Sequence, residues 1–104
     1  MKAILTALVF FFAVSANADV SQTYRFRFQA DFGRSANNVK QEVLEALPGI
    51  YSRYTTDVKW QVTRNGNGFF DVKFRAKTAA RIEGWINTLV AVTQDAIADV
   101  RRLD

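Results

Sequence analysis

Histidine and cysteine are both missing from this 104-residue sequence, which limits the chemistry that its side chains can carry out. Histidine is the side chain that most often exchanges protons near neutral pH, and the cysteine thiolate is a common nucleophile and metal ligand. Two carboxylates, Asp57 and Asp71, remain as candidates, but each is expected to face a lysine across a strand pair, which favours the ionised form and suits structure better than proton transfer. The sequence therefore predicts a non-enzymatic protein without catalytic residues, cofactors or a metal site.

Basic residues alternate with apolar ones in three segments, so they would share one face of the strands that this alternation predicts. We expect this face to stay uncovered, and it is the best candidate for a functional surface, which would be a shallow anion-binding surface. The alternative is a solvated face whose charges only keep the protein soluble. The expected binding residues are Arg25, Arg27, Lys59, Phe69, Lys73, Arg75 and Lys77, partly balanced by Asp31, Asp57 and Asp71, with Gln61 as a neutral contact.

A second candidate binding region follows Pro48-Gly49, where Tyr51, Arg53 and Tyr54 lie in a segment expected to connect a helix to a strand. Tyrosine and arginine are enriched among the residues that dominate binding energy at interfaces. The alternative is that the segment begins the second strand and that its rings close one end of the core.

The first 18 residues have the composition of a cleavable signal peptide. Lys2 supplies a positive start, residues 3–14 are almost all apolar, and Ala16-Asn17-Ala18 has the small residues that precede a signal-peptidase site. The apolar run is shorter than the roughly 20 residues that span a bilayer, so we expect cleavage and no membrane span afterwards. Residues 19–104 would then form one periplasmic or secreted domain, and the lack of cysteine favours a bacterial envelope.

Hydrophobic periodicity predicts five elements in residues 19–104. A strand over residues 22–32 precedes a helix that begins after Ser35 and ends at Pro48-Gly49, where proline and glycine follow the last apolar residue. Two further strands follow, and the longest helix is expected from Thr78 to about Arg102.

The two middle strands are expected to form a hairpin around Asn65-Gly66-Asn67-Gly68. Their apolar residues have even numbers, so even residues must pair with even residues to keep one apolar face. A three-residue loop over residues 64–66 satisfies this condition. It would place Lys59 opposite Asp71 and Asp57 opposite Lys73, two favourable charge pairs.

The order strand-helix-strand-strand-helix predicts an α+β fold of ferredoxin-like topology, with a three-stranded antiparallel sheet and both helices on one face. A right-handed crossover places the third strand between the first and the second. The first strand would then be an open edge, at which two copies of the chain could pair as a homodimer.

Together these features favour a small exported protein that acts by binding. We expect a protein-binding module, an accessory, inhibitor or assembly factor of an envelope system, whose envelope or secreted protein partner docks on the first-strand edge or the uncovered sheet face. The alternative is an anion-binding module that holds an acidic polymer or an anionic envelope component, with an affinity that falls steeply with salt. Nucleic acid is disfavoured because the expected face displays only Phe69 for base stacking.

Overall fold

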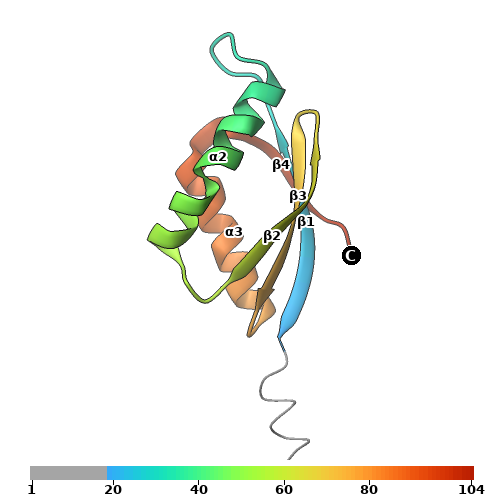
Figure 1. Cartoon of the computed structure of the whole chain (residues 1–104), viewed down its shortest axis with the longest axis vertical. Helices are drawn as coiled ribbons and strands as arrows, with labels where there is room; N and C mark the ends of the chain where they lie inside the picture. Colours follow the sequence, from blue (N-terminus) through green and yellow to red (C-terminus); the bar gives the residue numbers. More distant parts are fainter. Residues whose placement is uncertain (1–18) are drawn as a thin grey trace, which may run out of the picture.

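The computed structural model describes residues 19–104, which form a four-stranded antiparallel sheet with two helices on one of its faces (Figure 1). The predicted α+β class is confirmed, and the predicted signal peptide, residues 1–18, lies outside the described residues. Along the chain the elements are β1 (Val20–Phe28), α2 (Ala36–Tyr54), β2 (Lys59–Gly66), β3 (Phe69–Ala76), α3 (Ala79–Thr93), the short 3-10 helix η1 (Gln94–Ala96) and β4 (Ile97–Arg102).

An apolar layer between the sheet and the helices forms the core. Phe26 of β1 and Phe70 of β3 are paired across the two strands, fully buried, and lie with their ring centroids 5.7 Å apart. Ile82 and Leu89 of α3 belong to the same buried cluster. Burying one side chain of this size contributes about 1.5–3 kcal/mol, so this layer stabilises a domain that contains no disulfide.

The sheet has four strands in the order β2-β3-β1-β4, one more than the sequence predicts. α3 ends at Thr93 and β4 pairs antiparallel with β1, so the prediction of a helix running to Arg102 is wrong. The predicted place of β3 between β1 and β2 is confirmed. β1, however, lies inside the sheet, so the prediction that it forms an open edge is wrong and a second copy cannot pair there.

The spacing of apolar residues in β4 explains why the sequence indicates a helix. The register of β1 with β4 shifts between Arg27 and Phe28, which places Ile97 opposite Phe28 and Val100 opposite Phe26. Both β4 residues pack against the core. Residues three apart share a face of a helix but not of a regular strand, and the irregularity gives this strand the helical spacing.

Helix α2 continues six residues past Pro48 to Tyr54, so the predicted end of this helix is wrong. A proline inside a helix removes a backbone donor and costs about 3 kcal/mol. The last turn is held by the core, because the ring of Tyr51 packs against Trp60 and Trp85 at centroid distances of 5.9 and 6.0 Å. Burial of this ring opposes the cost of the proline.

The hairpin of β2 and β3 forms as predicted, but its register differs from the predicted one. The turn residues are Asn67-Gly68, and Lys59 lies opposite Arg75. The predicted pairs of Lys59 with Asp71 and of Asp57 with Lys73 are therefore wrong.

A bulge in β2 accounts for this difference. The register shifts between Val62 and Arg64, so Val62 lies opposite Val72 but Arg64 lies opposite Asp71. One additional residue in β2 lets a two-residue turn coexist with a matched apolar face. The parity argument fails because it assumes two regular strands.

Side chains of α2 hold the hairpin turn in place. The Asn37 side-chain oxygen accepts a hydrogen bond from the Gly68 N–H at 3.0 Å. The buried ammonium group of Lys40 donates to the Asn65 side-chain oxygen at 2.6 Å. The Asn/Gly-rich turn therefore also connects the sheet to the helical layer.

Candidate functional site

One face of the sheet is not covered by any element of residues 19–104 (Figure 1). Residues directly opposite each other in neighbouring strands point to the same side, so the strand pairing defines the rows of side chains on this face, here named the open face. From β2 towards β4 the rows are Lys59, Arg75 and Ser21; Gln61, Lys73 and Thr23; Arg64, Asp71, Arg25 and Arg101; and Gly66, Phe69, Arg27 and Asp99.

The open face concentrates positive charge. It carries seven basic residues and two carboxylates, although the whole sequence has 14 basic and 10 acidic residues. Two pairs of cations, Lys59 with Arg75 and Arg25 with Arg101, lie directly opposite each other in neighbouring strands. Like charges in this position destabilise a sheet, so the arrangement is not one that stability alone favours.

A polar cluster occupies the middle of the open face. The Arg25 guanidinium donates from Nε and Nη2 to both carboxylate oxygens of Asp71, at 2.8 and 3.0 Å. Asp71 is 4 % exposed, and the paired carboxylate raises the pKa of Arg25. This bidentate pair makes Arg25 a structural cation that is only partly available to a ligand.

Phe69 packs against the arginines of the same cluster. Its ring lies beneath the guanidinium carbons of Arg25, at 4.3 Å, and Arg64, at 5.4 Å, which are cation–π distances. The ring also lies over Gly66, where a Cβ atom would come within 2.1 Å of it. Phe69 is therefore a packed part of the face and is partly covered by two arginines.

A hollow of about 250 Å³ lies at the end of the open face that is farther from the β2–β3 hairpin turn. This end contains the rows of Lys59 and Lys73. The hollow is lined by Ser21, Lys59, Trp60, Gln61, Lys73 and Arg75. Lys59 and Lys73 form no ion pair with another residue of the described chain, and Arg75 has one contact of 3.6 Å with Asp19. The positive charge of this end is therefore exposed to solvent.

Most of the residues predicted for the open face do lie on it. The exception among the binding residues is Lys77, which follows the last residue of β3, Ala76. Asp31 and Asp57 lie in connecting segments, so neither balances the face.

Three charged residues of the open face are missing from the prediction: Arg64, Asp99 and Arg101. Arg64 reaches the face only through the bulge of β2, which the sequence does not reveal. Asp99 and Arg101 fall within the predicted last helix, although their alternation with Val100 is a signal for a strand.

The predicted binding loop with Tyr51, Arg53 and Tyr54 is the last turn of α2, so its assignment as a connection is wrong. Tyr51 lies in the aromatic packing at the edge of the core, and burial raises the pKa of its hydroxyl. This supports the alternative in which the ring closes the core. Arg53 and Tyr54 are exposed on the helix.

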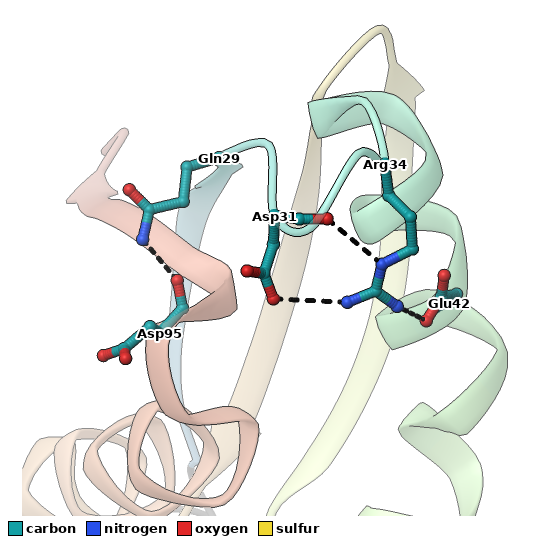
Figure 2. Close-up of polar contacts among 5 residues, drawn as sticks. All are labelled: Gln29, Asp31, Arg34, Glu42 and Asp95. Atoms are coloured by element: carbon teal, nitrogen blue, oxygen red, sulfur yellow. Dashed lines mark hydrogen bonds and ion pairs between the residues drawn. The ribbon is translucent and has the colours of Figure 1, made fainter.

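A hydrogen-bonded turn between β1 and α2 presents Phe32 to solvent. Asp31 and Arg34 exchange two backbone hydrogen bonds of 3.0 and 2.9 Å, and the Arg34 side chain contacts Asp31 and Glu42 (Figure 2). Phe32 is 95 % exposed and has a φ of +48°, a conformation that bulky residues rarely adopt. The strand predicted over residues 22–32 therefore ends early, at Phe28, and Phe32 does not join the apolar side chains of the core.

The carboxylates of the described chain are arranged for structure. The Thr55 hydroxyl and the Arg81 guanidinium, at 2.7 and 2.5 Å, lower the pKa of Asp57. Residues 19–104 contain no group of three acidic side chains placed to hold a metal ion. No helix within this range is both long and apolar enough to cross a membrane.

Comparison with known proteins adds no assignment: no family model, no curated protein and no solved structure matches the chain.

Proposed function

We propose that the protein is a small exported, non-enzymatic binding module that uses the open face of its sheet to bind an acidic polymer or another anionic envelope component. The observation that carries the proposal is the charge of this face, on which seven basic residues are balanced by two carboxylates. The composition of residues 1–18 supports a periplasmic or secreted location.

The shape of the open face suits a polymer better than a small molecule. The basic residues are distributed over all four strands, and the hollow at one end of the face is open to solvent. A polyanion can contact several such cations at once and release the counterions that it carried. The order β-α-β-β-α-β and the sheet order β2-β3-β1-β4 support our assignment of a ferredoxin-like topology, in which an uncovered sheet face is available for binding.

Retention on a sulfated dextran matrix tests the proposal. We expect the purified protein to bind at low salt and to elute as salt rises, because each cation on the face contributes a salt-dependent contact. Replacing Arg27→Gln and Lys73→Gln together should lower the salt concentration of elution and reduce the slope of log affinity against log salt by roughly two.

The matched control removes the same charge from the helical side. Arg53 and Arg81 are exposed on α2 and α3, so the double variant Arg53→Gln, Arg81→Gln has the same net charge as the test variant. Equal loss of retention in both variants would show that net charge alone drives binding and would contradict the proposal. Selective loss in the test variant would support it.

Phe32 favours a second candidate function, a protein-binding module that acts as an accessory, inhibitor or assembly factor of an envelope system. Phe32 is 95 % exposed on a turn that is closed by hydrogen bonds between Asp31 and Arg34. An aromatic side chain in such a position is suited to enter an apolar pocket of a partner protein. A photo-crosslinking residue at position 32 should then capture one defined envelope protein at high salt. Diffuse or salt-sensitive crosslinks would contradict this candidate.

A further inference from the structure

The two ends of the open face differ in how their charge is balanced. Towards the hairpin turn, Arg25 is paired with Asp71, and Arg27 lies opposite Asp99. At the hollow, Lys59 and Arg75 lie directly opposite each other, and Lys73 occupies the next row. No carboxylate lines the hollow.

Three cations close together repel one another, and this repulsion destabilises the folded protein when no ligand is bound. The hollow has the size of a small anion with part of its hydration shell, at about 250 Å³. Its wall also contains the Gln61 amide and the Ser21 hydroxyl, which are neutral hydrogen-bond donors. The lining therefore offers positive charge and directed donors, and no competing acceptor carboxylate.

We propose that this hollow is a binding site for a phosphate group, held by Lys59, Lys73 and Arg75. The inference rests on the proposed function and specifies the chemistry of the ligand. A phosphate monoester carries about −1.5 to −2 charges near neutral pH and three acceptor oxygens, so it satisfies three cations better than a carboxylate, which carries a single charge.

Two carboxylates lie near the hollow but outside its lining. Asp19 contacts the Arg75 guanidinium at 3.6 Å, a long ion pair between partly exposed groups. Asp104 is held at β1, where it accepts hydrogen bonds from the Thr23 N–H at 3.1 and 3.2 Å, and it also contacts Arg102. Asp19 therefore competes weakly for one of the three cations, and Lys59 and Lys73 remain available.

Titration with inorganic phosphate, followed by backbone amide NMR, tests the site. We expect saturable shifts confined to the β1, β2 and β3 residues around the hollow, and shifts at least several-fold smaller with acetate at equal ionic strength. Lys73→Gln should weaken phosphate binding about tenfold, because a hydrogen bond to a charged group is lost. Arg27→Gln, on the same face but away from the hollow, should leave phosphate binding unchanged within a factor of two, and both variants should keep the native amide spectrum elsewhere.

Two results would overturn the inference: non-saturable phosphate shifts spread over the whole open face, or equal weakening by Lys73→Gln and Arg27→Gln. If either occurred while the protein still bound sulfated dextran through the open face, the proposed function would stand and the phosphate site would be rejected. Vesicles of phosphatidylcholine with or without phosphatidic acid then identify the source of the phosphate. Binding that needs phosphatidic acid and is lost in Lys73→Gln assigns a lipid headgroup, whereas phosphate binding without vesicle binding assigns a soluble or polymer-borne group.

Discussion

Arg25 and Asp71 face each other across β1 and β3 and form a bidentate ion pair, with hydrogen bonds of 2.8 and 3.0 Å, on the uncovered side of the sheet. The carboxylate is nearly inaccessible although no helix covers it, and the Arg25 guanidinium that binds it lies over the Phe69 ring. The open face thus combines a structural pair at its centre with exposed cations around it.

Removal of this carboxylate should destabilise the fold. Asp71→Ala leaves the Arg25 guanidinium without its acceptor, and we expect the free energy of unfolding to fall by roughly 2–3 kcal/mol. Asp99→Ala, an exposed carboxylate of the same face, should change it by less than about 0.5 kcal/mol. Urea unfolding of the two variants measures the difference. Equal effects would show that the pair contributes no more than a surface charge.

Gly66 and Phe69 should be coupled. A methyl group at residue 66 would lie within 2.1 Å of the Phe69 ring, so Gly66→Ala must displace the ring from Arg25 and should cost about 1–2 kcal/mol. With Phe69→Ala already present, Gly66→Ala should be neutral or stabilising, because glycine weakens a strand. A double-mutant cycle by thermal or urea unfolding checks this. The same cost in both backgrounds would contradict the contact.

Phe32→Asn should stabilise the protein. Phe32 and Gly33 both have positive φ, as a type I′ turn requires, and Asn-Gly is a preferred sequence for such a turn. The phenylalanine ring is almost fully exposed, so its removal costs no core packing, and relief of the left-handed strain should increase stability by about 0.5–1 kcal/mol. Gly33→Ala, at a φ of +79°, should destabilise instead. Loss of stability in Phe32→Asn would show that the ring has a structural role.

Acid should destabilise the protein partly through Asp57 and Asp104. Hydrogen bonds from Thr55 and Arg81 lower the pKa of Asp57, and the Thr23 N–H and Arg102 lower the pKa of Asp104. A lowered pKa means that the unfolded chain binds protons first as pH falls, so stability is full above the unfolded pKa of about 3.9 and is lost as pH falls through the folded pKa.

The pH dependence of the melting temperature measures this contribution. Asp57→Asn should make the decrease in melting temperature between pH 5 and pH 2 smaller, because one linked proton is removed. Asp95→Asn serves as the control, since Asp95 is exposed and its side chain forms no ion pair within residues 19–104. An unchanged slope in Asp57→Asn would contradict the assignment.

Local patterns in the sequence indicate most of the strands and helices, and they indicate which residues of β1 and β3 lie on the core face and which lie on the open face. Alternation in β1 and β3 separates Phe26 and Phe70 from Arg25 and Asp71, because successive strand residues point to opposite faces whatever the partner strand is. The same alternation placed Arg27, Lys59, Lys73 and Arg75 together on one face. The α+β class follows from these periods and from the helical spacing in residues 36–47.

Only the tertiary structure decided which strands meet, in which register, and where the helices end. The bulge near Thr63 and the irregularity opposite Phe28 each shift a register by one residue, which reassigns Arg64, Ile97 and Val100 to faces that their spacing does not indicate. The hydrogen bonds that β4 makes with β1, and the packing of Tyr51 beyond Pro48, involve residues far apart in sequence. Such long-range contacts outweigh local preferences, because burial of apolar groups and pairing of strand edges contribute more free energy than the propensity of any short segment.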